Sequence, residues 1–212
     1  MRWGVRAVGL LGAGWILAGC ATVEIREARV VRGRIVDEAG APVANTPVTL
    51  VGRTLSWAPV QFAYREEGRR ELAARTDETG EYRFELTPAE LGNNFYLFFY
   101  GAEGFDAVRY RRSEPIDITE PLKVQRELRF DQVLRTNPDW PQVQRLLAQE
   151  GAGSPKGQIL RTHGLPEKRE PFTLEGKEGE TWWYYSLGVS YRFLGPNLLG
   201  RYPLEPAPGK AR

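Results

Sequence analysis

The sequence predicts a mainly β protein: a β-sandwich followed by a small module of two helices and three strands. Between residues 30 and 130, short β-branched or aromatic runs alternate with Gly-containing turn signals, which is typical of a sandwich. After the turn at 77–80, Tyr82, Phe84 and Leu86 alternate with charged residues, as a half-buried strand requires. Between residues 137 and 163, two Pro-initiated segments carry helical spacing instead.

Seven strands are expected in the sandwich, at 30–36, 48–51, 71–76, 81–86, 95–100, 116–118 and 124–130. The run FYLFFY at 95–100 is apolar throughout, which predicts a central strand buried on both faces. Asp37 with Gly40 and Asp77 with Gly80 predict tight turns, in which the carboxylate accepts turn amides and the glycine takes positive φ. No further oxygen ligands stand near either turn, so a calcium site is not predicted.

Two motifs in this region carry a family resemblance. GRIVDEAGAPV at 33–43, continuing to PVTL at 47–50, resembles the opening of a carboxypeptidase regulatory-like domain, and TDETGEYRF at 76–84 is similar to its second signature. The resemblance implies an immunoglobulin-like, transthyretin-like sandwich over residues 30–130. The segment 52–70, which contains Trp57, Phe62 and Tyr64, is longer than in compact family members. It is interpreted as an extra hairpin or as a loop used for contacts.

The C-terminal part has a different pattern. Helices are expected at 142–149 and 156–163, with Ser154 as N-cap and Pro155 in the first turn of the second helix. Strands are expected at 168–173, 181–187 and 189–193, with a polar hairpin turn at 175–179. The Pro-rich tail at 201–212 is expected to be extended or disordered.

This order of elements resembles a known small lipoprotein domain. The residues Gly157, Ile159-Leu160 and HGLP at 163–166, followed by Glu180 and WYY at 183–185, are similar to the SmpA/OmlA (BamE-like) family. The resemblance implies a BamE-like α+β domain over residues 131–200 and an accessory role in outer-membrane protein assembly. In that family the domain lies close behind the lipidated cysteine, whereas here a sandwich intervenes.

The N-terminus predicts export and lipidation. Arg2 and Arg6 precede an uncharged run at 8–18, which suits a signal peptide over residues 1–19 and is too short to span a membrane. LAGC at 17–20 resembles the lipobox of bacterial lipoproteins, which implies cleavage before Cys20 and its modification with diacylglyceryl and a further acyl chain such as palmitate. Residues 20–29 form the linker. A plain cleaved signal peptide with a chance cysteine is the alternative.

Localisation and charge narrow the choice of partners. Ala21 follows the cysteine, and by the sorting habit of lipoproteins this favours the periplasmic face of the outer membrane. Cleavage removes two basic residues from 29 Lys+Arg and leaves 27 against 27 Asp+Glu, so the mature chain is near neutral and nucleic acid is not an expected partner. With one cysteine, no intramolecular disulfide can form.

No active site is predicted from the sequence. His163, the single histidine, stands at a helix end, where a cation suits the helix dipole and a structural role is favoured. Neither Ser154 nor Ser186 has a nucleophile-elbow context, and the ligands for a zinc site are lacking. No cofactor and no metal are expected. A hydrolase that joins Ser154, His163 and a carboxylate between domains stays as the less favoured alternative.

Exposed aromatic surfaces are the candidate functional feature. In a strand, Trp182 and Tyr184 would point to one side and Trp183 and Tyr185 to the other, so one pair faces the helices as core. The other pair is either a candidate protein contact or is covered by the tail or by the sandwich. The long insert poses the same question for its three aromatic residues. The expected function is that of a non-enzymatic, lipid-anchored binding or scaffolding protein whose partner is an envelope protein or glycan.

Overall fold

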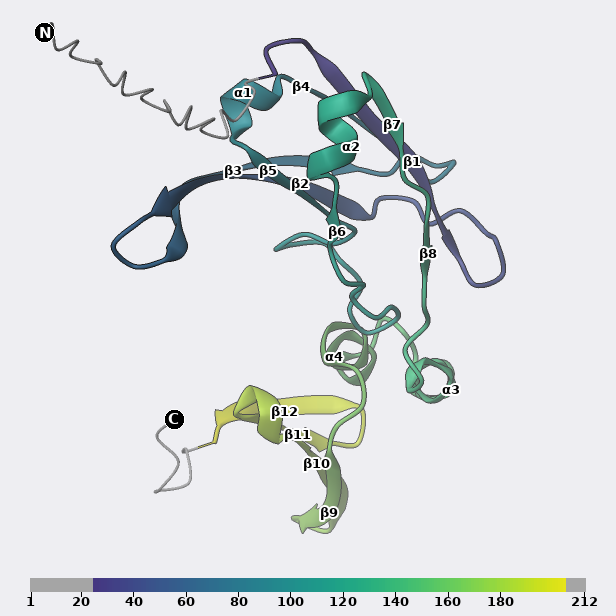
Figure 1. Cartoon of the computed structure of the whole chain (residues 1–212). Helices are drawn as coiled ribbons and strands as arrows, with labels where there is room; N and C mark the ends of the chain where they lie inside the picture. The colour runs from purple at the N-terminus through teal and green to yellow at the C-terminus, as the bar shows by residue number, and fades with distance from the viewer. Residues whose placement is uncertain (1–24, 205–212) are drawn as a thin grey trace, which may run out of the picture.

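The computed structural model describes residues 25–204, and the fold is mainly β, as predicted (Figure 1). The predicted signal peptide, Cys20, Ala21 and residues 205–212 of the tail lie outside the described residues. No helix within 25–204 is long and apolar enough to cross a membrane.

Two four-stranded sheets in the N-terminal part enclose one hydrophobic core. In the first sheet, β1 lies between β4 and β7 and also pairs with β8, and the second sheet has the order β3–β2–β5–β6. The strands are β1 (Arg29–Asp37), β2 (Pro47–Ala58), β3 (Ala63–Arg75), β4 (Glu81–Leu86), β5 (Asn94–Phe98), β6 (Ile116–Asp117), β7 (Glu127–Arg129) and β8 (Gln132–Leu134). Val31 of β1, Leu50 of β2 and Phe84 of β4 meet in this core, so both sheets contribute to it.

The turn chemistry expected from the sequence is confirmed. Oδ1 of Asp37 accepts hydrogen bonds from the amides of Ala39 and Ala41, and Oδ1 of Asp77 accepts from those of Thr79 and Glu81. The glycines of the two turns, at 40 and 80, have φ of 81° and 79°. The alternation of β4 is also confirmed, because all three of its apolar side chains are buried.

The prediction that 95–100 is buried on both faces is wrong. β5 is a central strand, but Phe95, Leu97 and Phe99 are buried whereas the residues between them are only half-buried. The outward side chains are covered by cations rather than by a second layer: the guanidinium of Arg53 lies 5.4 Å from the ring centre of Tyr96. Periodicity could not reveal this, because aromatic residues serve equally well in a core and under an arginine.

The segment 116–130 is not two strands alone. Its middle forms helix α2 (Thr119–Val124), so the expected strand at 124–130 shortens to β7. A second short helix, α1 (Pro88–Leu91), was also not predicted. Strand pairing continues past residue 130, because β8 pairs with β1 and Leu134 lies in the first core. The expected domain boundary at Phe130 therefore falls between two strands that share β1 as partner.

The C-terminal part is an antiparallel sheet with two helices on one face. The sheet has the order β12–β11–β10–β9, and Ile159, Leu160, Trp182 and Phe193 form its core with the helices. The elements are α3 (Trp140–Glu150), α4 (Pro155–His163), β9 (Lys168–Leu174), β10 (Lys177–Tyr184), the 3₁₀ helix η1 (Tyr185–Leu187), β11 (Val189–Leu194) and β12 (Asn197–Pro203).

Sequence reasoning captured the start of α4 but missed the last strand. Ser154 caps α4, with its Oγ accepting from the amide of Gly157 at 3.0 Å, as predicted. The module has four strands rather than three, because residues 197–203 form β12 on the edge beside β11. The expected tail thus begins two residues before β12 ends. The hairpin turn between β9 and β10 is tighter than expected, with Glu175 and Gly176 both at positive φ.

Candidate functional site: two exposed aromatic surfaces

The first surface is the end of the β2–β3 hairpin. β2 pairs with β5 only from Thr49 to Arg53, whereas its pairing with β3 continues to Ala58 opposite Ala63. The ribbon beyond the second sheet therefore has two strands, and Figure 1 shows it projecting from the body. The long insert is the extra hairpin, one of the two alternatives expected. We call residues 54–64 the hairpin tip; no charged residue occurs among them.

The aromatic side chains of the hairpin tip are exposed. Trp57, Phe62 and Tyr64 have 50%, 84% and 71% of their surfaces accessible, and Val60 has 94%. The rings of Trp57 and Tyr64 meet across the ribbon in an edge-to-face pair with centroids 5.2 Å apart. Phe62 has φ of 48°, a left-handed conformation that is costly for a bulky residue. Strained residues of this kind concentrate at functional positions.

The base of the ribbon is held firmly to the body. The side-chain amide of Asn93 donates to the carbonyl of Leu55 at 2.8 Å and accepts from its N–H at 2.9 Å. The backbone N–H of Asn93 also donates to the carbonyl of Arg53. Asn93 therefore fixes β2 to the body as far as Leu55, and the rest of the hairpin tip projects beyond this point.

The second surface comes from the run of four aromatic residues in β10 and η1. Trp182 and Tyr184 are the inward pair: they are 0% and 2% exposed and pack in the second core. The hydroxyl of Tyr184 donates to the carbonyl of Gly164 at 3.0 Å, and burial raises the pKa of this phenol. These two residues are therefore core residues and no longer candidates for protein contact. Trp183 and Tyr185 are the outward pair.

The outward pair forms a flat, supported aromatic surface. The rings of Trp183 and Tyr185 are nearly parallel, at 12°, with centroids 5.7 Å apart. Nε1 of Trp183 donates to a carboxylate oxygen of Glu170 on the neighbouring strand at 3.2 Å. Tyr202 of β12 lies in the same cross-sheet row as Trp183, through Ser190. Tyr202 and Tyr185 are 44% and 50% exposed, whereas Trp183 is half-buried. We call Trp183, Tyr185 and Tyr202 the sheet face.

Sequence reasoning missed Tyr202, because residues 201–212 were assigned to a tail. The one sign of a further strand in the sequence was the presence of apolar residues at 198, 199 and 202, all of which are exposed in the structure. The sandwich residues that the structure describes contact the helices on the opposite side of the sheet, where the guanidinium of Arg109 lies 5.8 Å from the ring centre of Trp140. The side chain of Val108 likewise lies beside Gly164 at the end of α4.

Ser154 and His163 are not brought together. They occupy the N-cap and the last residue of α4, and Ser154 uses its hydroxyl to cap the helix. Nε2 of His163 lies 2.9 Å from the hydroxyl of Tyr191. Burial, and to a lesser degree Arg201, lower the pKa of His163, so the cation expected at this helix end is disfavoured. The serine–histidine cluster that a hydrolase would need is not formed.

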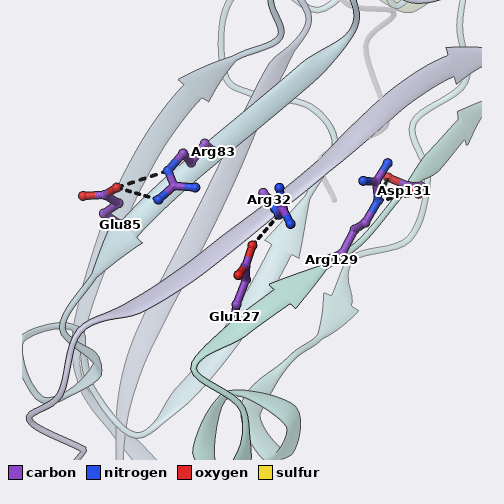
Figure 2. A network of polar contacts seen from close by, with 6 residues as sticks. All are labelled: Arg32, Arg83, Glu85, Glu127, Arg129 and Asp131. Carbon is purple, nitrogen blue, oxygen red and sulfur yellow. Dashed lines mark hydrogen bonds and ion pairs between the residues drawn. The ribbon is translucent and has the colours of Figure 1, made fainter.

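A third surface feature, which is polar, covers the outer face of the first sheet. Arg83, Arg32 and Arg129 lie opposite one another on β4, β1 and β7, and Figure 2 shows each beside a carboxylate. The partners are Glu85, Glu127 and Asp131, and the pKa of Asp131 is lowered chiefly by its hydrogen bond with Arg129. A hollow of about 300 Å³ adjoins the row. Because the charges balance, we regard this row as a solvated ion-pair ladder.

Within residues 25–204, no group of three or more His, Cys, Asp or Glu residues is arranged to hold a metal ion. Among the described residues, the two aromatic surfaces are therefore the candidate binding sites. Large exposed aromatic groups are over-represented at interfaces, where they bury much area with few rotatable bonds.

Comparisons with known proteins give no family. No family model and no curated protein matches the chain. Among solved structures, a streptococcal ancillary pilin is similar over 52% of this chain and 33% of its own, with 16% identity and a TM-score of 0.34. A 9R-lipoxygenase from Cyanothece PCC8801 is similar over 87% of this chain and 43% of its own, with 11% identity and a TM-score of 0.32. The chain thus spans less than half the length of either, and likeness at this level carries no functional argument.

Proposed function

We propose that the protein is a lipid-anchored, non-enzymatic lipoprotein of the cell envelope that binds or scaffolds another envelope component. In this proposal Cys20 carries the lipid and the protein lies on the periplasmic face of the outer membrane. The partner is an envelope protein or glycan held on the sheet face. The support for the anchor is the LAGC sequence behind an apolar run of signal-peptide length.

We also propose the two family folds expected from the sequence: a carboxypeptidase regulatory-like sandwich and a BamE-like module. The shared core of the first two sheets supports the former, and the order α3, α4, then an antiparallel sheet supports the latter. Because β8 pairs with β1, we propose that the division between them lies after β8 rather than after residue 130.

The observation that carries the binding proposal is the stacked pair of Trp183 and Tyr185. The pair is backed by the second core and fixed by Glu170, so it loses little side-chain entropy when a partner covers it. Pre-ordered Trp and Tyr side chains of this kind are the residues that dominate interface energies.

The test is a mild-detergent pull-down of the full lipidated chain from its own membranes. The variant Trp183→Ser/Tyr185→Ser is expected to lose the partner that the native chain retains. The matched control is Tyr64→Ser, which removes a tyrosine of the hairpin tip that is 71% exposed, against 50% for Tyr185. Partner capture that is equal in native and double-variant samples would reject the sheet face as the binding site. Point variants are preferred to truncation after Phe130, because such a cut would remove β8 from the first sheet.

A second candidate function is an accessory role in outer-membrane protein assembly. The observation that favours it is the helix-helix-sheet order of residues 140–203, in which both helices lie on one face. It predicts that the captured partner is a barrel-assembly component. Capture of unrelated proteins by the same surface would leave the binding proposal intact and remove this one.

A further inference from the structure

The hairpin tip has no assigned role in the binding proposal. We propose that it inserts into the interface of a lipid bilayer, where it forms a second attachment beside the lipid on Cys20. The inference deepens the proposed function and rests on it for the anchor alone. The sequence of the tip, TLSWAPVQFAY, is uncharged over residues 54–64 and is bounded by Arg53 and Arg65.

The shape and composition of the tip suit a lipid surface. A two-stranded ribbon that ends in a turn is convex, so it forms no cleft of its own. Such a shape can insert into a lipid surface. Trp and Tyr are enriched at membrane–water interfaces, because their rings are apolar and their N–H or O–H groups stay hydrated. Phe62 and Val60 at the very end are the most exposed, and they have no polar atom on the side chain.

The charges at the base fit the same surface. Arg65 is exposed directly behind the tip, and Arg69 and Arg70 follow it on β3. Against these stand Glu66, which pairs with Arg53 at 3.4 Å, Glu67, which accepts from the hydroxyl of Ser56, and Glu71, which pairs with Arg69 at 2.6 Å. All three carboxylates thus have partners within the ribbon, whereas the exposed guanidinium groups of Arg65 and Arg70 can reach lipid phosphates.

The position of the hairpin relative to the anchor is the second, independent observation. The carbonyl of Ile25 accepts a hydrogen bond from the amide of Ala89 in α1 at 3.0 Å. Leu91 of the same helix lies against Gly52 of β2, so tightly that a Cβ at this glycine would come within 2.4 Å of its carbonyl oxygen. Ile25, the first described residue, and the base of the ribbon therefore both contact α1.

This arrangement limits the distance from the body to the membrane. Four residues lie between Cys20 and Ile25, and the five steps from one to the other span at most about 17 Å when fully extended. The ribbon from Arg53 to Val60 has a comparable reach, of about 23 Å at the rise of a strand. The tip can thus meet the bilayer that holds the lipid. Figure 1 shows α1 at the end of the molecule remote from the C-terminal sheet, so an attachment beside α1 would keep that sheet at a distance from the bilayer.

A groove on a partner protein is the competing occupant. Besides the indole N–H of Trp57 and the hydroxyl of Tyr64, the polar side chains of the tip are those of Thr54, Ser56 and Gln61, and the hydroxyl of Ser56 is already bound to Glu67. Specific protein recognition relies on such polar groups around an aromatic centre, whereas insertion into lipid does not. The lack of charge and the shared contact with α1 favour the bilayer.

The test uses the mature chain from residue 20 with Cys20→Ser, so that no acyl group contributes. The probe is co-flotation with vesicles of phosphatidylethanolamine and phosphatidylglycerol. Native tip sequence is expected to bind, and Trp57→Ser/Phe62→Ser is expected to lower the partition coefficient about tenfold or more. Val124→Ser, which removes an apolar side chain that is 82% exposed at the end of α2, is the control and is expected to bind as the parent does. Unchanged circular dichroism must accompany each variant.

Three outcomes decide the proposal. Loss of vesicle binding only in the tip variant supports it. Equal binding of parent and tip variant, or no binding of the parent, overturns it. Loss of a protein partner by the tip variant without any vesicle binding would overturn it in favour of a protein groove. Mass measurement of the native chain tests acylation of Cys20 separately, so failure of the anchor and failure of the tip are distinguishable.

Discussion

Nζ of Lys156 in α4 lies 2.5 Å from Oε1 of Glu180 in β10. The lysine side chain is only 10% exposed and also contacts Glu150 of α3 at 3.2 Å, so one ammonium group joins both helices to the sheet. Its Nζ lies 5.9 Å from the ring centre of Trp182. The ion cluster thus fixes the helix pair on the inner side of the strand whose outer side carries Trp183.

Lys156→Met is expected to destabilise the protein by about 2 kcal/mol, less than the usual cost of an unpaired buried charge, because Glu150 and Glu180 lose the cation they share while Glu180 keeps Arg169. Chemical denaturation of the purified chain measures the change. Lys168→Met is the control: Lys168 and Glu170 are both about half exposed, and such surface pairs contribute about 0.5 kcal/mol or less. Equal effects of the two substitutions would show that the Lys156 cluster is not a buried ion pair.

Stability is expected to fall in acid partly through Glu180. Burial alone would raise the pKa of this carboxyl, but hydrogen bonds from Lys156 and Arg169 outweigh burial and hold the pKa below its ordinary value of 4.5. A lowered native pKa stabilises the fold above the unfolded value, and this stabilisation is lost as the pH falls through the native pKa. The unfolding free energy of Glu180→Gln should therefore depend less on pH below 4.5 than that of the native chain. Parallel curves for the two proteins would contradict this cause.

Gly33→Ala is expected to destabilise the first sheet by about 3 kcal/mol, the upper range for overpacking. A Cβ at this position would lie 1.7 Å from the carbonyl oxygen of Phe130, in backbone that cannot move without breaking the pairing of β1 with β7 and β8. Thermal unfolding measures the effect. Gly153→Ala is the control, because nothing lies within 4 Å of a Cβ there.

Ser154→Ala is expected to cost about 1 kcal/mol, the usual cost of losing a helix N-cap. The native partner should still be captured, because Ser154 takes no part in the sheet face. Ser154 and His163 also lie at opposite ends of α4, so they do not form a catalytic pair. Loss of all biological activity with unchanged stability would instead indicate a chemical role for this hydroxyl.

Local chemistry in the sequence was enough to predict the turns at Asp37 and Asp77, the alternation in β4 and the start of α4. Each of these depends on a few adjacent residues. β12 was missed because Leu198 and Leu199 are both exposed, so the edge strand shows no alternation to detect. α2 was missed because six residues hold too little periodic signal.

The choice between the two aromatic pairs required long-range information. Adjacent side chains in a strand point to alternate faces, but the sequence does not show which face the helices cover. In the structure the hydrogen bond from Tyr184 to Gly164, at the end of α4, shows that Tyr184 lies on the helix side. The arginine row depends likewise on the register of β1 with β4 and β7, strands separated by about fifty residues or more along the chain. The length of the hairpin, by contrast, was visible as an insert with three aromatic residues.

Site-specific photo-crosslinking in the cells that make the protein tests the central claim most directly. A photoreactive phenylalanine analogue would replace Tyr185 on the sheet face or, as control, Glu85 on the exposed ion-pair ladder. We expect a discrete adduct with an envelope protein or glycan at position 185 and none at position 85. Adducts that are absent from position 185, or equal at both positions, would contradict the assignment of the sheet face as the partner-binding surface.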